Sequence, residues 1–320
     1  MNKDWGFNNA GAFISKKHSE IYPAIDPRNL ALPNAGENMP FNVCVVGASR
    51  GIGAGIAAAY AQAGATGLIL ASRRISGLEE TAKRCRDIAK QPSDLKVEIV
   101  SCDITKPADV EGLAAKASEL LGGRLDVVVL NSGTSGEVRL KLHEVPVDEF
   151  VHTTSVNYLG TFYVAKYFVP MLLSSMKANK GVGGEFMIVS SWASLIVRGP
   201  IANAQYCLSK MAQLKLAENL HEEYSEEGLN VYAVHPGAVA TEIALETSPE
   251  NFKEFLTDSP DLCGAFMVWI SSTSSAFGQN VLRKDWLSGR FVDAKWDVEE
   301  LEGKREELGD GDSLKLRMLV

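Results

Sequence analysis

The stretch Asn42-Val43-Cys44-Val45-Val46-Gly47-Ala48-Ser49-Arg50-Gly51-Ile52-Gly53 decides the fold of this chain. Residues 42–46 form a short apolar run typical of a buried strand, and small residues with helical spacing follow at 56–63. The glycines therefore lie where a strand ends and a helix begins. At such a turn the backbone can approach a pyrophosphate closely, and free N–H groups of the helix bind it. The residues expected to form this phosphate-binding turn are Gly47, Ser49, Arg50, Gly51, Ile52 and Gly53; a tight turn without a ligand is the alternative.

Short apolar runs alternate with helical segments on the carboxyl side of this turn. Further strands are expected at residues 67–71, 97–101, 125–130, 184–190 and 229–234, with 291–293 as a candidate edge strand. Helices are expected at 109–121, 147–176 and 204–224. Repeated βα units of this kind build a parallel sheet with helices on both faces. We predict an α/β fold, a Rossmann-type doubly wound parallel sheet in a single domain.

The predicted domain spans residues 41–320, and residues 1–40 form an N-terminal extension. This extension is rich in Asn, Pro and Gly and shows no sustained periodicity. Its stretch 21–25 either packs on the domain surface or belongs to a loosely ordered arm. No function is assigned to it.

Composition excludes several classes of protein. The 320 residues carry a net charge of -8, and no run of Lys and Arg suits a nucleic acid or an anionic membrane. No apolar run is long enough to span a membrane. The five cysteines form no CxxC pair, so we expect reduced thiols in a cytoplasmic protein. No cluster of His, Cys, Asp and Glu has the spacing of a metal site.

The end of the second predicted strand indicates which dinucleotide binds. In many dinucleotide-binding folds an acidic residue about 20 positions after the glycine turn binds the ribose 2′-hydroxyl. Here the chain reads Ala71-Ser72-Arg73-Arg74, without a carboxylate. A hydroxyl and a guanidinium suit a 2′-phosphate, and Arg50 would add a second positive charge. We predict NADP(H) rather than NAD, held by Ser72 and Arg73, with Arg74 as a solvated residue opening a surface helix.

Tyr206 and Lys210 lie four residues apart in a predicted helix and therefore share one face. An ammonium about 4 Å from a phenol, at an effective dielectric of about 20, is worth roughly 4 kcal/mol. That would lower the pKa of the phenol from about 10 to about 7. Such a tyrosine can donate a proton to an alkoxide or remove one from an alcohol. Ser191, just after the strand at 184–190, would position the same oxygen.

Six motifs in order resemble the short-chain dehydrogenase/reductase family over residues 41–295. They are Gly51-Ile52-Gly53, Cys102-Asp103-Ile104, Asn131-Ser132-Gly133, Val156-Asn157, Ser191 with Tyr206 and Lys210, and Pro236-Gly237-Ala238-Val239-Ala240-Thr241. The resemblance implies that Asp103 and Ile104 border the adenine and that Asn131 lies along the cofactor. It also implies that Asn157 supports a proton-relay water with Lys210, and that Val239 and Thr241 contact the nicotinamide end.

Three departures from the family pattern are visible. Val46 replaces the usual threonine before the first glycine, and Ser132 replaces the usual alanine after Asn131. Ser191 precedes Tyr206 by fifteen residues where the family usually has thirteen, so Ser190 is a less favoured alternative. The longer loop suggests an apolar wall for the substrate, or plain loop packing, from Trp192, Ser194, Ile196 and Val197.

The rest of the substrate boundary is expected from residues 240–263. Ile243, Leu245, Phe252 and Phe255 would cap an apolar substrate, whereas Glu242, Glu246 and Glu250 are expected to be solvated. His235 is expected to be a packed residue at a strand end rather than a base.

These observations predict an NADP(H)-dependent oxidoreductase that transfers hydride between the nicotinamide and the carbonyl or secondary alcohol of a small, moderately apolar molecule, with reduction of a ketone favoured. The alternatives are an NAD-dependent alcohol dehydrogenase and a non-catalytic NADP(H)-sensing protein of the same fold. The helices at 147–176 and 204–224 resemble those at the family's oligomer interfaces, which implies a homo-dimer or homo-tetramer.

Overall fold

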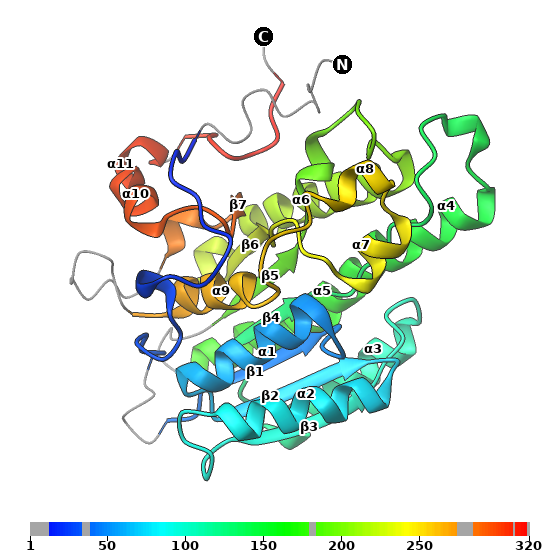
Figure 1. The fold of residues 1–320 in the computed structure, drawn as a ribbon. Helices are drawn as coiled ribbons and strands as arrows, with labels where there is room; N and C mark the ends of the chain where they lie inside the picture. The colour runs from blue at the N-terminus through cyan, green and yellow to red at the C-terminus, as the bar shows by residue number, and fades with distance from the viewer. Residues whose placement is uncertain (1–12, 34–38, 179–183, 274–283, 310, 319–320) are drawn as a thin grey trace.

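A seven-stranded parallel sheet forms the centre of the molecule in this computed structural model, which describes residues 13–33, 39–178, 184–273, 284–309 and 311–318 (Figure 1). The strand order is β3-β2-β1-β4-β5-β6-β7. The strands are β1 (Asn42–Val46), β2 (Gly67–Ser72), β3 (Lys96–Ser101), β4 (Val127–Leu130), β5 (Glu185–Val189), β6 (Asn230–His235) and β7 (Arg290–Asp293). The predicted doubly wound Rossmann-type fold is confirmed. β2 and β3 lie on one side of β1 and β4 to β7 on the other, so the strand order reverses between β1 and β4.

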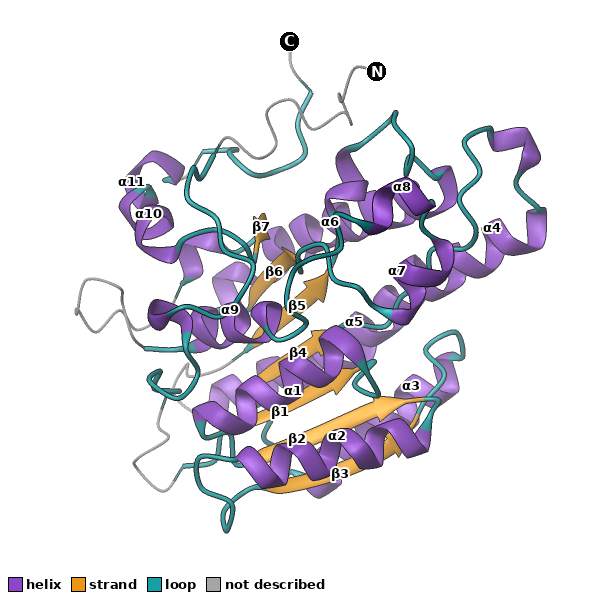
Figure 2. Cartoon of the chain, in the orientation of Figure 1, coloured by secondary structure: helices purple, strands orange, loops and turns teal. Residues whose placement is uncertain are grey.

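Helices cover both faces of the sheet (Figure 2). One face is covered by α1 (Gly51–Ala63), α2 (Ile75–Ile88) and α9 (Leu262–Ser271). The other is covered by α3 (Pro107–Leu120), α5 (Gly160–Ala178) and α6 (Ala204–Tyr224). Their buried apolar side chains pack on β1 and its neighbours, whose residues are buried on both faces as parallel strands require.

Shorter helices lie at the carboxyl edge of the sheet and near the end of the chain. They are α4 (Val147–Thr154), α7 (Glu242–Thr247), α8 (Glu250–Lys253), α10 (Val298–Gly303) and α11 (Arg305–Leu308). The helix expected at 147–176 is divided, because a π-helical turn at Ser155–Leu159 separates α4 from α5. Such a turn widens the helix locally and is frequent at functional sites.

Part of the N-terminal extension packs against the far end of the chain. Ile14 and Ile25 are fully buried, and the Tyr22 hydroxyl donates a 3.1 Å hydrogen bond to the Trp296 carbonyl. His18 lies 2.8 Å from a carboxylate oxygen of Asp297. Described residues of the extension therefore contribute to the apolar core beside α9 and α10.

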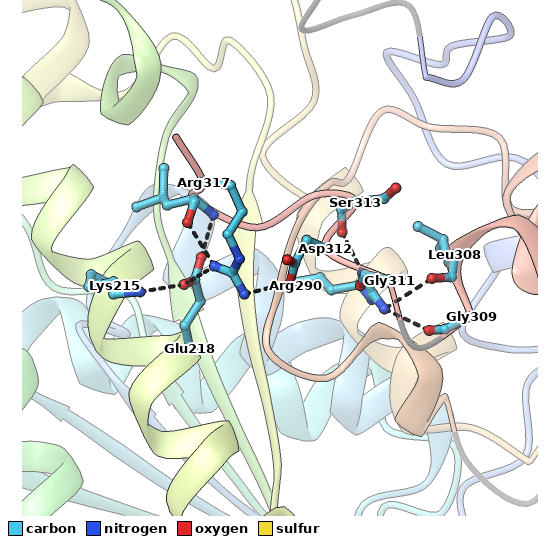
Figure 3. A network of polar contacts seen from close by, with 10 residues as sticks. Lys215, Glu218, Arg290, Leu308, Gly309, Gly311, Asp312, Ser313 and Arg317 are labelled. Atoms are coloured by element: carbon cyan, nitrogen blue, oxygen red, sulfur yellow. Dashed lines mark hydrogen bonds and ion pairs between the residues drawn. The ribbon is translucent and has the colours of Figure 1, made fainter. Parts of the chain in front are cut away.

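The C-terminal tail runs along β7, the edge strand of the sheet. The Phe291 amide donates a 2.9 Å hydrogen bond to the Leu314 carbonyl. The two terminal nitrogens of the Arg290 guanidinium donate to the carbonyls of Leu308, Gly309, Gly311 and Ser313, and its Nε donates to the Trp286 carbonyl at 3.0 Å (Figure 3). Glu218 of α6 accepts from the Leu316 amide and from Arg317. The tail is thus fixed by charge-assisted hydrogen bonds, which are stronger than neutral ones.

Candidate active site

A cavity of about 940 Å³ crosses the carboxyl ends of the parallel strands. Ligands of open α/β sheets bind in this position, next to the point where the strand order reverses. The cavity brings together most of the site residues expected from the sequence, namely Gly47, Ser49, Arg50, Gly51, Ile52, Ser72, Arg73, Asp103, Ile104, Asn131, Tyr206, Lys210 and Thr241. The expected residues Gly53, Asn157, Ser191 and Val239 do not line it, and Ala240 and Ile243 border it beside Thr241.

The glycine turn packs closely against neighbouring backbone, and it also lines the cavity. Gly47 has a φ of 96°, and a Cβ there would collide with the backbone of Ser132. A Cβ on Gly53 would collide with the Gly47 carbonyl, which accepts a 2.8 Å hydrogen bond from the Asn131 side chain. Gly51, the first residue of α1, lines the cavity together with Gly47. Because the first turn of α1 holds no acidic residue, its N–H groups are available to an anion.

Three arginines and Ser72 line the cavity beyond the end of β2. Within the described ranges, Arg73 forms no ion pair. The pKa of Asp103 is lowered: burial raises it, but hydrogen bonds from Thr105 and the charge of Arg73 outweigh burial. Arg74 donates a 3.2 Å hydrogen bond to the Ser49 carbonyl and is therefore not simply solvated. The cavity, the exposed amides of α1 and this cluster of cations fit a dinucleotide that carries several phosphates.

Glu242 is exposed, as expected from the sequence, and it has an interaction that the sequence did not predict. Its carboxylate forms an ion pair with Arg50, and Arg74 lies 4.0 Å from the same oxygen. The reason is that α7 begins directly above the glycine turn, where the Thr241 methyl group lies 3.4 Å from the Cβ position of Gly51. Position in the fold, rather than local sequence, places this carboxylate among the arginines.

Tyr206 lines the cavity, and its hydroxyl has the side chain of Ser191, which does not line the cavity, as a hydrogen-bonding partner. Ser191 follows β5 and also accepts a 3.1 Å hydrogen bond from the Ala193 amide, so its hydroxyl is held by the turn at Trp192–Leu195. Lys210, one turn after Tyr206 on α6, lies with its Nζ 5.7 Å from the centre of the tyrosine ring. The expected pairing of tyrosine and lysine on one helix face is present.

The pKa values in the cofactor-free protein differ from the expected shift. Burial raises the pKa of Tyr206 to about 12, although the Ser191 hydrogen bond lowers it, and burial lowers the pKa of Lys210 to about 7. The expected pKa of about 7 for the phenol is therefore wrong for this state. The physical reason is desolvation, which disfavours the charged form of both groups, while Nζ lies beside the ring and donates to the Val189 carbonyl at 2.9 Å.

Asn157 lies in the π-helical turn and is fully buried. Its side chain accepts a 2.9 Å hydrogen bond from the Thr134 amide and donates to the Thr134 carbonyl at 2.7 Å and to the Ser209 hydroxyl at 2.9 Å. Its own carbonyl accepts from Gln213 at 2.8 Å. The Cβ position of Gly133 lies 3.4 Å from the Asn157 side-chain oxygen and 3.6 Å from Lys210 Nζ. Asn157 thus fixes the loop after β4 against α6, next to the lysine.

The substrate side of the cavity differs in part from the expected apolar wall. Ile196 is buried against Tyr206 and Cys207, and Val197 is 90% exposed, so neither faces the cavity. Trp192 packs edge-on against Phe291 and donates a 2.7 Å hydrogen bond from its indole to Asp293. Ser194 donates to the Ser191 carbonyl. The two extra residues of this loop are therefore accommodated by packing on β7 and α6.

The stretch after β6 places two short helices beside the cavity. Ile243 lines the cavity, whereas Leu245 and Phe255 are exposed, and Phe255 pairs with Phe252 at a ring distance of 6.0 Å. Thr247, the last residue of α7, lies 2.7 Å from the Ser135 hydroxyl. His235 packs against Trp192, and burial lowers its pKa, which agrees with a packed residue.

Comparison with known proteins gives the family. A family model described as short chain dehydrogenase matches residues 42–251, which include the glycine turn, Ser191, Tyr206 and Lys210. The chain belongs to the short-chain dehydrogenase/reductase family. Members of this family are oxidoreductases that use a nicotinamide cofactor, and the predicted family is confirmed.

Curated relatives match nearly the whole of this short-chain dehydrogenase/reductase. It is 36% identical to short chain dehydrogenase pgmD of Aspergillus terreus over 320 residues, covering 99% of this chain and 96% of that protein. It is also 36% identical to short chain dehydrogenase citE of Monascus ruber, over 96% of this chain and 97% of that protein. A third relative, 1-deoxy-11-beta-hydroxypentalenate dehydrogenase of Streptomyces avermitilis, is 33% identical over 74% of this chain and 83% of that protein.

Solved structures share the fold of this short-chain dehydrogenase/reductase. A short-chain type dehydrogenase/reductase from Mycobacterium marinum superposes with a TM-score of 0.68 at 23% identity, covering 85% of this chain and 97% of that one. An alcohol dehydrogenase from Thermococcus sibiricus, solved with 5-hydroxy-NADP, has a TM-score of 0.60 at 27% identity, covering 72% of this chain and 89% of that one.

Several residues of this short-chain dehydrogenase/reductase site were missed by sequence reasoning. Glu242, Thr134 and Gln213 act through contacts between elements distant in the chain, and no local pattern signals such contacts. Within the described ranges, no group of His, Cys, Asp and Glu residues has an arrangement that could hold a metal ion. Among the same residues, no helix combines the length and apolar composition needed to cross a membrane.

Proposed function

We propose that this chain is an NADP(H)-dependent reductase that converts a ketone of a small, moderately apolar molecule to a secondary alcohol. The observation that carries the proposal is the pairing of Tyr206 with Ser191 and Lys210, in which Tyr206 and Lys210 line the cavity beside the glycine turn and the arginines. A polarising hydroxyl and a proton donor at one point suit reduction of a carbonyl.

The residues have distinct roles in this mechanism. The bound cofactor supplies the hydride. Tyr206 is protonated at neutral pH, since burial raises its pKa to about 12, and it donates its proton to the developing alkoxide. Ser191 donates a hydrogen bond to the same oxygen and orients it. Lys210 binds the nicotinamide ribose through Nζ. Asn157, which holds the loop after β4 next to Lys210, supports a proton-relay water together with that lysine.

The preference for NADP(H) is supported by the charge at the end of β2. Ser72, Arg73 and Arg74 follow that strand, Arg50 faces them from the glycine turn, and the ribose-binding carboxylate of NAD-dependent enzymes is not found there. The solved relatives include complexes with 5-hydroxy-NADP and with NAD, so the preference rests on the residues of this chain.

The moderately apolar substrate is supported by Ile243 at the cavity, beside the polar residues Thr134 and Thr241. The Streptomyces relative is named as the dehydrogenase of a hydroxy compound, which is the reverse chemistry on the same functional groups. A cytoplasmic setting is proposed because all five cysteines are buried free thiols.

We also propose a homo-oligomer, a dimer or a tetramer. Exposed apolar side chains gather on α4, α5 and α6, with Val147 79%, Val151 57%, Phe162 44% and Leu208 46% exposed. Exposed apolar residues on neighbouring helices are typical of association surfaces. Sedimentation velocity tests this, since a single monomeric species across the concentration range would contradict it.

Calorimetric titration tests the cofactor assignment. NADPH and NADH are titrated separately into the wild-type protein and into Arg73→Ala. We expect NADPH to bind more tightly to the wild type and to lose this advantage in the variant. Preference for NADH would favour an NAD-dependent alcohol dehydrogenase. Tight NADPH binding without turnover of any carbonyl compound would favour a non-catalytic sensor.

A further inference from the structure

Glu242 lies among the residues proposed to bind the cofactor phosphate. Its carboxylate pairs with Arg50, and Arg74 lies 4.0 Å from the same oxygen. All three side chains line the dinucleotide cavity. A carboxylate beside two guanidinium groups at a proposed phosphate site has the charge of an anionic ligand and lies where such a ligand would bind.

We propose that Glu242 is an internal competitor of the cofactor 2′-phosphate and a determinant of cofactor selectivity. In the cofactor-free protein its carboxylate takes the guanidinium donors that the phosphate would otherwise receive. Binding of NADP(H) must break this ion pair or bring a phosphate next to a carboxylate, and both cost free energy. NAD(H) lacks the 2′-phosphate and does not meet this cost. Glu242 therefore narrows the difference in affinity between the two cofactors. This inference rests on the proposed assignment of the arginines to the phosphate.

The solvent exposure of the Arg50–Glu242 pair sets the size of its effect on cofactor affinity. The side chains of Arg50 and Glu242 are 39% and 50% exposed, so solvent screens the pair. Exposed pairs of this kind are worth up to about 1 kcal/mol, which corresponds to roughly a fivefold change in affinity. The competition therefore adjusts affinity without blocking the site.

The position of α7 explains why Glu242 can leave the arginines. Glu242 is the first residue of α7, and the Thr241 side chain caps this helix at its N-terminus by accepting from the Ala244 amide at 3.2 Å. Thr247 holds the other end at Ser135. Because the helix has these two attachments of its own, Glu242 can change rotamer without loss of α7.

Calorimetric titration of NADPH and NADH into Glu242→Gln tests the inference, with Glu246→Gln as the matched control. Glu246 is an exposed residue of the same helix and has no ion pair among the described residues. We expect the Kd for NADPH to fall about three- to fivefold in Glu242→Gln, with the Kd for NADH unchanged within about twofold and both Kd values unchanged in Glu246→Gln.

Three results would overturn the inference. They are an unchanged Kd for NADPH, weaker NADPH binding, and equal tightening for both cofactors. The wild-type titration separately tests the proposed NADP(H) preference. If the wild type binds NADH more tightly, that preference fails, and the role of Glu242 is still decided by whether its substitution selectively tightens NADPH binding.

Discussion

Lys210 and Val189 are joined by a 2.9 Å hydrogen bond from the lysine Nζ to the main-chain carbonyl at the end of β5. This bond ties a buried ammonium on α6 to the sheet, and it fixes Nζ beside the ring of Tyr206. Burial lowers the pKa of Lys210 from 10.5 to about 7. The lysine is thus held in place by the backbone at a cost in stability that depends on pH.

The first prediction concerns this cost. In the unfolded chain Lys210 stays protonated up to its ordinary pKa, so between about pH 7 and 10.5 the unfolded state binds more protons and the stability of the folded state rises with pH. The burial penalty is therefore largest below pH 7. We expect Lys210→Met to be more stable relative to wild type at pH 6 than at pH 9.5, as measured by thermal unfolding. A difference in Tm that is the same at both pH values would contradict the lowered pKa.

The second prediction concerns Tyr206. Removal of its hydroxyl in Tyr206→Phe is expected to reduce kcat by roughly 10²- to 10⁴-fold, the usual contribution of a general acid. Binding of NADPH should be unchanged, because the arginines and the glycine turn remain. Tyr224→Phe, at the other end of α6, is the control and should keep full activity. Steady-state kinetics with a ketone substrate measures both, and normal turnover by Tyr206→Phe would remove the tyrosine from the mechanism.

The third prediction concerns Asn157. Asn157→Ala removes three hydrogen bonds from a buried side chain, two to Thr134 and one to Ser209, and we expect it to lower the free energy of unfolding by about 2–3 kcal/mol. It should also lower kcat, because the loop beside Lys210 loses its support. Asn251→Ala, on the exposed surface of α8, is expected to change stability by less than about 0.5 kcal/mol. Denaturant unfolding compares the stability of the two variants. If both substitutions change the free energy of unfolding by equally small amounts, Asn157 does not have a positioning role.

The fourth prediction concerns Trp192 and Asp293. Trp192→Phe keeps an aromatic ring against Phe291 but removes the 2.7 Å hydrogen bond to the buried Asp293 carboxylate. A hydrogen bond to a charged group is worth about 1.5–3 kcal/mol, and we expect a loss of that size in urea unfolding. Trp286→Phe is the matched control, since no hydrogen bond from its indole nitrogen is found among the described residues. Equal losses of stability in Trp192→Phe and Trp286→Phe would mean that the smaller ring, and not the lost hydrogen bond, causes the effect.

The fold was predictable because its signals are local. The apolar runs at β1 and β6 and the helix at Ala204–Tyr224 lie where the spacing of apolar residues predicted them, since burial against a sheet imposes that spacing. The π-helical turn at Ser155–Leu159 was not predicted. Asn157 in this turn forms hydrogen bonds with Thr134 and Gln213, which are far away in sequence, and no local pattern signals such contacts.

The candidate site also combines features that local sequence predicts with features that it does not. Tyr206 and Lys210 are four residues apart, so helix geometry alone places them together. The pKa expected for Tyr206 was wrong, because burial is a property of the folded protein that spacing does not reveal. The ion pair of Glu242 with Arg50 joins residues on α7 and the glycine turn, and only the three-dimensional structure brings them together.

The C-terminal tail on β7 limits how copies of this chain can associate. An uncovered parallel edge offers unpaired amide and carbonyl groups to any strand that arrives. Here the Phe291 amide is already bonded to the Leu314 carbonyl, and Arg290 and Glu218 anchor the residues on either side. A second copy therefore cannot extend the sheet past β7 without first displacing the tail. The tail thus hinders open-ended strand addition at this edge, and the proposed homo-oligomer would have to form through the helical surfaces instead.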